Sequence, residues 1–177
     1  TRGRPATGAS FDRGTVGGCD VTSPVDVDAD AVRDAWHERS GEFSPAYYAY
    51  YGPDETSELV FDRLAGLDRD AAILELGCGS GRHLAHLYER GFRDLAGIEI
   101  NQDARAVIRE HYPDLARVGR FRFDAIETVL PGIETDAVDA VFAVETLQHI
   151  HPDDEWVFAE VARIAAESGL AAGADRV

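Results

Sequence analysis

Three glycines at alternate positions follow an acidic residue in the segment Glu75-Leu76-Gly77-Cys78-Gly79-Ser80-Gly81. Glycine lets the backbone turn tightly and come close to a ligand, because it has no Cβ atom. The N–H groups of such a loop, together with the start of a following helix, favour a negative group such as a carboxylate or phosphate. The segment therefore predicts a ligand-binding loop, in which Cys78 is a small filler and not a nucleophile.

Acidic residues also come at the ends of three other short apolar segments, as Glu99, Asp124 and Glu145. Glu99 follows Glu75 at close to the ~20-residue offset at which a nucleotide-binding fold places the acid that binds ribose. A carboxylate at this place would accept hydrogen bonds from both ribose hydroxyls and would disfavour a 2′-phosphate. The spacing therefore predicts a site for a nucleoside.

These acids can act together only if the fold brings the ends of their segments to one place. Short apolar runs predict strands at 71–76, 94–99, 121–123 and 138–144. Helical periodicity and capping residues predict helices at 30–39, 45–51, 57–67, 80–90, 101–111 and 152–164, with Asn101 as one of the caps. Strands that alternate with helices predict an α/β fold with an open, mostly parallel sheet and helices on both faces. The carboxyl ends of such strands share one edge, where ligands bind.

The motifs, in this order, resemble those of class I S-adenosylmethionine (SAM) dependent methyltransferases over about residues 57–166. The loop reads G-x-G-x-G and has Arg82 where a dinucleotide fingerprint needs glycine, which disfavours an NAD-dependent oxidoreductase. The segment from Glu145 to Ile150 resembles the fourth motif of small-molecule members. The resemblance implies a Rossmann-like sheet and SAM as the cofactor, with Asp124 accepting a hydrogen bond from the adenine amino group. The expected cofactor-binding residues are Glu75, Gly77, Cys78, Gly79, Gly81, Glu99, Ile100, Asp124, Ala125 and Val144.

The same resemblance implies methyl transfer to an unidentified small-molecule acceptor. The methyl group of SAM is already activated, so proximity and orientation supply most of the catalysis and no dedicated catalytic residue is required. Glu145 and His149 are the candidates for a base that takes a proton from the acceptor. The alternative that we favour for His149 is packing against the sheet edge. The tyrosines at 47, 48, 50 and 51 lie in a region that would form a lid, where they would either hold the substrate or simply pack on the domain.

The chain carries 33 Asp and Glu residues against 17 Arg residues, a net charge of −16. Such a charge repels phosphate groups, so neither nucleic acid nor a membrane surface is an expected partner. The simplest explanation of the negative charge is a solvated surface. The more specific alternative is adaptation to a high-salt cytoplasm. We expect no metal site, because no Cys/His cluster has zinc-binding spacing. We expect a cytoplasmic protein, because no apolar run reaches about 18 residues and no signal peptide is visible.

Four regions follow from these patterns. We expect residues 1–28 to form a disordered or non-native tail, 29–67 an N-terminal helical lid, 68–166 the SAM-binding domain and 167–177 an irregular tail. The family resembled has seven strands, and only strands 1–4 are recognisable. We therefore expect a truncated chain, a reading frame that changes near Ile164, or a partner that completes the exposed fourth strand. The competing functional interpretation is a truncated or noncatalytic SAM- or nucleotide-binding module.

Overall fold

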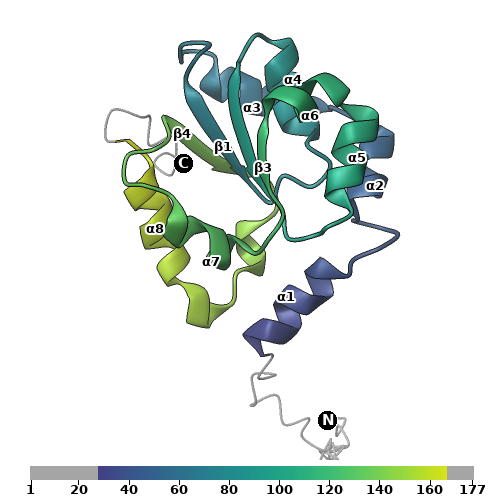
Figure 1. Ribbon diagram of the computed structural model, residues 1–177, viewed down its shortest axis with the longest axis vertical. Coiled ribbons are helices and arrows are strands. Elements are labelled where there is room, and N and C mark those ends of the chain that lie inside the picture. The colour runs from purple at the N-terminus through teal and green to yellow at the C-terminus, as the bar shows by residue number, and fades with distance from the viewer. Residues whose placement is uncertain (1–27, 167–177) are drawn as a thin grey trace, which may run out of the picture.

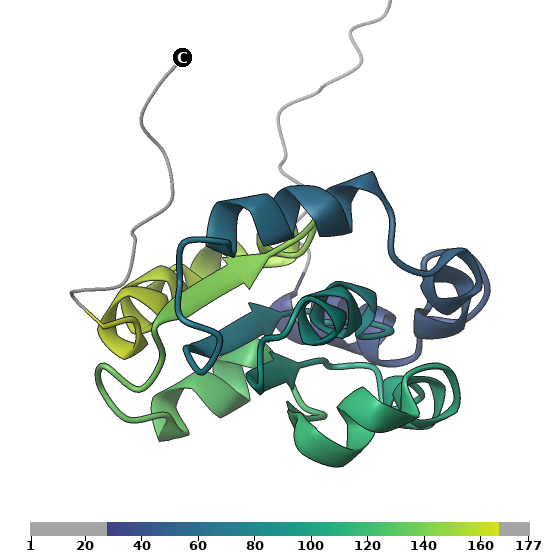
Figure 2. The ribbon, with the colours of Figure 1, turned by 90° about the horizontal axis from the view of Figure 1, so that it is seen from above.

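The computed structural model describes residues 28–166, in which a four-stranded parallel sheet lies between two groups of helices (Figures 1 and 2). The strands are β1 (Ala72–Leu76), β2 (Asp94–Ile98), β3 (Arg120–Arg122) and β4 (Ala140–Ala143). Their order is β3-β2-β1-β4, and every pair is parallel. The predicted α/β fold with an open parallel sheet is confirmed. All carboxyl ends of the strands therefore lie on one edge.

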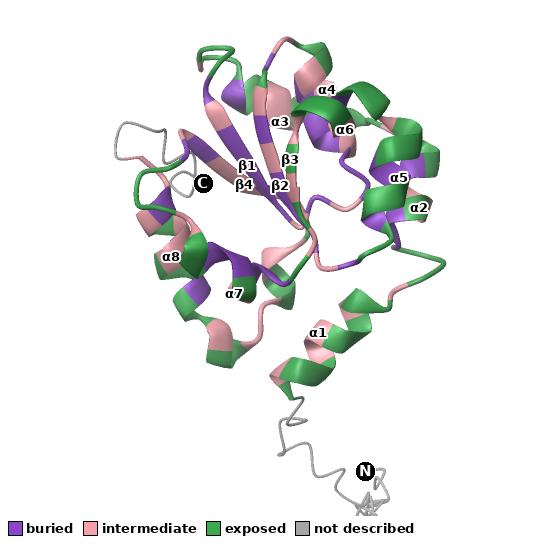
Figure 3. Ribbon diagram, viewed as in Figure 1, coloured by how far each residue is buried: buried purple, intermediate pink, exposed green. Residues whose placement is uncertain are grey.

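The helices on one face are α3 (Glu55–Leu64), α4 (Arg82–Glu89), α5 (Ala104–His111) and α6 (Pro113–Val118). They bury Leu64, Leu84, Ile108 and Leu115 in a core on one side of the sheet, to which β1 contributes Ile73. The helices on the other face are α7 (Ile126–Val129) and α8 (Trp156–Ile164). The short 3-10 helix η1 (Leu130–Gly132) follows α7. Because both faces are covered, successive residues of β1 are buried, and the strand is apolar except for Glu75 (Figure 3).

The remaining elements lie near the carboxyl ends of the strands. They are α1 (Ala29–His37), α2 (Pro45–Tyr51) and the 3-10 turns η2 (Leu147–His149) and η3 (Pro152–Asp154). Figure 1 shows α1 beyond the edge at which the strand arrows end. Arg33 of α1 forms an ion pair with Asp154 of η3, which joins the first described helix to the segment after β4. Ser44 caps α2 by accepting a hydrogen bond from Tyr47 N–H, and proline begins the helix.

Some predicted helix limits were wrong. Helix α3 begins after Asp54, whose carboxylate caps it, and not at Ser57. Asn101 does not cap α5, which begins after Asp103. Instead, Asn101 Oδ1 accepts the N–H of Asp103 at 3.0 Å, and its Nδ2 donates to the carbonyl of Arg39 at 2.8 Å. The side chain therefore ties the α1–α2 connection to the end of β2. Helices α6 and α7 were not predicted.

The free edge of β4 is the place where a fifth strand would pair. Residues that leave α8 turn back along this edge, where Val138 and Ala165 form a parallel bridge. Ala166 N–H donates to the carbonyl of Val138 at 2.9 Å. The interpretations of residues 1–27 and 167–177 as tails lie outside the described residues. None of the helices within 28–166 combines the length and apolar character that crossing a membrane requires.

The close approach of the glycine loop to β2 depends on Gly97. A Cβ atom added there would lie 2.6 Å from Cys78 Sγ and 3.1 Å from Leu84 Cδ1. We expect Gly97→Ala to lower the free energy of unfolding by about 1–3 kcal/mol, because the loop or α4 must move. Gly66→Ala is the matched control, since no atom lies within 4 Å of its added Cβ. Urea unfolding measures both variants, and equal midpoints for the two would contradict this packing argument.

Candidate functional site

A cavity of about 570 Å³ opens at the carboxyl ends of β1, β2 and β4. Its walls come from the loops that follow these three strands, from α1 and α2, and from the first residues of α4 and α7. The volume is typical of a site for a small molecule or cofactor. Most of the expected cofactor residues line it: Glu75, Gly77, Cys78, Gly79, Glu99, Ile100 and Val144. The structure therefore brings the glycine loop and the acids of β1 and β2 into one cavity.

All three glycines of the loop have positive φ, and their surroundings differ. Gly77 has φ 70°, and a Cβ atom there would lie 2.2 Å from Thr146 Oγ1, so glycine lets the loop after β4 approach. Gly79 has φ 51°, and no atom lies within 4 Å of an added Cβ. Gly79 also lines the cavity, so the space over this residue is open to a ligand. Gly81 caps the start of α4 next to Ile108 and is not among the residues that line the cavity.

The side chain of Glu99 links the glycine loop to the end of β2 through a hydrogen bond. Its Oε2 accepts the N–H of Gly79 at 2.7 Å, and its Oε1 accepts the N–H of Asn101 at 2.8 Å. Burial raises the pKa of the carboxyl group, while these backbone N–H groups act in the opposite direction. A carboxylate offers about four lone-pair positions. One position on each oxygen therefore remains for a ligand that carries two adjacent hydroxyl groups.

Two buried polar atoms at the glycine loop have no hydrogen-bond partner within residues 28–166. They are Oε2 of Glu75, whose side chain is almost fully buried, and Oγ of Ser80. Burial, and then the charge of Glu99, raise the pKa of Glu75 well above its ordinary value. Leaving a buried acceptor unpaired costs about 1–3 kcal/mol. A ligand that donates to Glu75 would remove this cost, so these residues fit a bound group with a polar end.

Cys78, Asp124 and Ala125 are three further residues that were expected to contact the cofactor. Burial raises the pKa of the Cys78 thiol well above its ordinary value, which suits a filler. Asp124 is exposed, and its Oδ1 accepts the N–H of Ala125 at 2.8 Å. Neither Asp124 nor Ala125 lines the cavity, where Ile126 and Glu127 stand instead. The adenine contact of Asp124 stays a prediction.

On the opposite side of the cavity, the loop after β4 supplies Glu145 and His149. Glu145 has φ 53°, a conformation that a non-glycine residue adopts at some cost and that is common at functional sites. The ring of His149 lies 4.4 Å from the ring of Trp36 in α1, measured between centroids. The contact is with α1 and not with the sheet edge, so packing of His149 against the sheet edge stays a prediction. A role as base stays a prediction for both residues.

Only one of the four tyrosines of α2 lines the cavity. Tyr48 does so, and the guanidinium of Arg82 lies 5.0 Å from the centre of its ring. Tyr50 is 84% exposed, and Tyr47 and Tyr51 contact each other edge to face. Among the four tyrosines of α2, Tyr48 is therefore the one placed to contact a ligand in the cavity.

Sequence reasoning missed several residues that line the cavity: Trp36, Arg39, His83 and Asn101. His83 had a detectable signal, because it stands two positions after the last glycine on the first turn of a predicted helix. Trp36 in α1 and Arg39 just after that helix lie far from the loop in sequence, so no local pattern marked them. Within the described part of the chain, no three His, Cys, Asp or Glu side chains gather in a way that could hold a metal ion.

Comparison with known proteins gives concordant matches. The family described as methyltransferase domain matches residues 74–172. Methyltransferase GfsG of Streptomyces halstedii is 26% identical over 124 residues, which cover 70% of this chain and 44% of that protein. O-methyltransferase cnsE of Penicillium expansum is 26% identical over 152 residues, which cover 82% of this chain and 54% of that protein. The chain thus spans about half the length of these curated relatives.

A solved structure agrees with the fold. Geranyl diphosphate C-methyltransferase from Streptomyces coelicolor A3(2), in complex with Mg²⁺, geranyl diphosphate and S-adenosyl-L-homocysteine, matches with a TM-score of 0.59 at 16% identity. The match covers 81% of this chain and 62% of that one. The family match extends over more than half of the sequence, and the sheet order and glycine loop agree with it. The chain therefore belongs to the class I SAM-dependent methyltransferase family.

Proposed function

We propose that this chain binds SAM in the cavity at the strand ends and takes part in transferring its methyl group to a small-molecule acceptor. The observation that carries the proposal is the carboxylate of Glu99. It is held by Gly79 and Asn101 with one lone pair free on each oxygen, as the two ribose hydroxyls of SAM require. Glu75, with its unpaired buried oxygen, would accept a hydrogen bond from the ammonium group of the cofactor.

When bound, SAM supplies a methyl group that its sulfonium has already activated. The residues of the chain then hold the cofactor and the acceptor in line, and such positioning can contribute ~7–11 kcal/mol. An acceptor that reacts through a hydroxyl or an ammonium group must also lose a proton. Glu145 and His149 both line the cavity on the side of the β4 loop, where they could take that proton.

Equilibrium binding tests the cofactor assignment. In calorimetry we expect SAM and S-adenosylhomocysteine to bind the chain at one site, and NADH not to bind. The glycine loop has Arg82 where a dinucleotide site needs its third glycine. Binding of NADH with no binding of SAM would refute the proposal.

Turnover separates methyl transfer from binding alone. With radiolabelled SAM, we expect label to appear in a pool of small molecules that carry hydroxyl, amine or activated-carbon nucleophiles. Tight binding of SAM with no transfer to any acceptor would favour the alternative, a noncatalytic SAM-binding module.

A further inference from the structure

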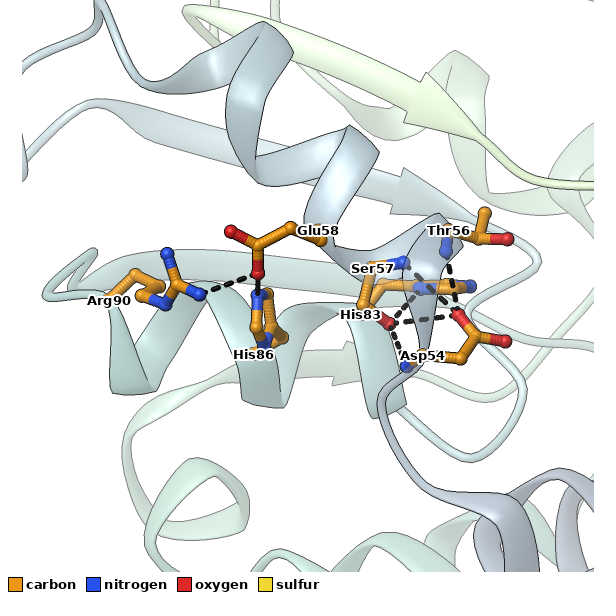
Figure 4. Close-up of polar contacts among 7 residues, drawn as sticks. All are labelled: Asp54, Thr56, Ser57, Glu58, His83, His86 and Arg90. Carbon is orange, nitrogen blue, oxygen red and sulfur yellow. Dashed lines mark hydrogen bonds and ion pairs between the residues drawn. The ribbon is translucent and has the colours of Figure 1, made fainter.

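Three arginine side chains line the cavity, and they differ in whether a carboxylate neutralises them. Arg33 forms ion pairs with Asp154 of η3 and with an aspartate of its own helix. Arg82 forms an ion pair with Asp54, whose carboxylate also caps α3 (Figure 4). Arg39 forms no ion pair with a carboxylate among residues 28–166. Of these three cations, Arg39 is therefore the one whose charge is left for a ligand.

The guanidinium of Arg39 is held in one position by its neighbours. Its central carbon lies 5.1 Å from the centre of the Trp36 ring and 5.3 Å from the centre of the Phe43 ring. Its Nε donates to the carbonyl of Glu42 at 3.2 Å. Nη1 and Nη2 have no hydrogen-bond partner in the described part of the chain. Paired N–H donors of this kind match the oxygens of a carboxylate or a phosphate.

The backbone that carries these groups is also fixed. The carbonyl of Arg39 accepts Nδ2–H of Asn101 at 2.8 Å, and the N–H of Asn101 donates to Glu99 at the end of β2. Phe43 has φ 65°, a conformation that costs a non-glycine residue some stability and that is common at functional sites. The donors of Arg39 are therefore in place before a ligand arrives, which lowers the entropy cost of binding.

Tyr48 relates Arg39 to the side of the cavity where proton removal is proposed. Burial and the charge of Glu145 raise the pKa of Tyr48, whereas the charges of Arg82 and Arg39 act in the opposite direction. The phenol is thus within electrostatic range of both Arg39 and Glu145, and all three side chains line the cavity. A negatively charged group is repelled by Glu145 and attracted by Arg39. A molecule held at Arg39 would therefore lie in the same part of the cavity as the candidate base.

We propose that the methyl acceptor carries a negatively charged group, a carboxylate or a phosphate, and that Arg39 is the specificity-determining residue that binds this group through Nη1 and Nη2. The inference rests on the proposed function, because it concerns the acceptor of the same methyl transfer. Trp36, Phe43 and Tyr48 line the cavity and offer aromatic surface to the apolar part of such an acceptor. A neutral acceptor would leave Arg39 without a counter-ion, and a cationic one would be repelled.

Four probes with one aromatic ring each test the preference for an anion. Benzoate and phenyl phosphate are anions, benzamide is neutral and benzylamine is a cation. We titrate each probe by NMR into the protein saturated with S-adenosylhomocysteine. The wild type should bind at least one anion about 10-fold or more tightly than benzamide, and benzylamine most weakly. The anion with the higher affinity identifies the group as a carboxylate or a phosphate.

Arg39→Ala should weaken binding of the preferred anion about 10- to 100-fold, because hydrogen bonds from a charged group are lost. The affinities for benzamide and for S-adenosylhomocysteine should change less than about 2-fold, since neither depends on the free donors of Arg39. Arg39→Lys should recover part of the anion affinity, because lysine keeps the charge but not the paired donors.

Arg69→Ala is the matched control. The guanidinium of Arg69 also lies over two aromatic rings, those of Phe61 and Phe92, and donates to the carbonyl of Leu67, but it does not line the cavity. This variant should bind every probe like the wild type. Equal affinities of the wild type for the anions and benzamide, or unchanged anion affinity in Arg39→Ala, would overturn the inference. Loss of S-adenosylhomocysteine affinity in Arg39→Ala with anion binding retained would assign Arg39 to the cofactor and overturn it as well. Failure of the wild type to bind S-adenosylhomocysteine would instead refute the proposed function.

Discussion

Replacing Glu99 with alanine is expected to weaken SAM binding about 100-fold, measured by calorimetry as the dissociation constant. The carboxylate is anchored by Gly79 and Asn101, and it keeps one lone pair on each oxygen for the ribose hydroxyls. A hydrogen bond to a charged group contributes about 1.5–3 kcal/mol. Two such bonds at the lower end of this range amount to ~3 kcal/mol, or about 100-fold in affinity.

Two further variants separate the loss of the ribose contacts from a general change in the fold. Glu99→Gln keeps a carbonyl oxygen that can accept one backbone N–H, but its amide nitrogen cannot accept the other. We therefore expect an intermediate loss of about 10-fold. Glu110→Ala, on the exposed side of α5, should bind SAM like the wild type. Wild-type affinity in Glu99→Ala would show that the ribose does not lie at this carboxylate.

The glycine loop and Glu99 were predictable because their chemistry is tied to local pattern. A glycine run after an apolar segment and before a helix has few structural uses, and an acid at the next strand end lies nearby in any parallel sheet. The alternation of strands and helices likewise predicted the parallel sheet. The assignment of Asp124 came from the family resemblance. In the structure, Asp124 precedes the turn into α7 and does not line the cavity, whereas Glu127 of α7 does. Helix α7 has only four residues, too few to show helical periodicity.

Contacts between residues distant in sequence could not be predicted in this way. Asn101 looked like a helix cap, since Asn is a common cap and a helix follows soon after. Its side chain instead reaches the carbonyl of Arg39, which lies 62 residues earlier in the chain. His83 Nδ1 likewise lies 2.8 Å from Ser57 Oγ, 26 residues away on another helix. Both contacts depend on how helices pack around the loop, which helix propensity and motif spacing do not record.

Glu99 and the loop also depend on each other. The N–H of Gly79 that holds the carboxylate belongs to a residue in the left-handed region, so the backbone there sets where the carboxylate points. A side chain at position 79 would therefore act on the site in two ways. It would strain the backbone that donates to Glu99, and it would fill the open space above the loop.

Gly79→Val is accordingly expected to abolish measurable SAM binding, with a loss of more than about 100-fold. A β-branched residue in the left-handed region costs roughly 1–2 kcal/mol in stability, and its methyl groups would occupy the space that a bound cofactor needs. Gly41→Val is the matched control, because Gly41 has φ 70° and open space around its added Cβ, yet does not line the cavity. Both variants should lose similar stability in thermal unfolding, and only Gly79→Val should lose SAM binding. Retained affinity in Gly79→Val would mean that the cofactor does not pass over the glycine loop, and equal loss in both variants would mean that backbone strain, and not the filled space, controls binding.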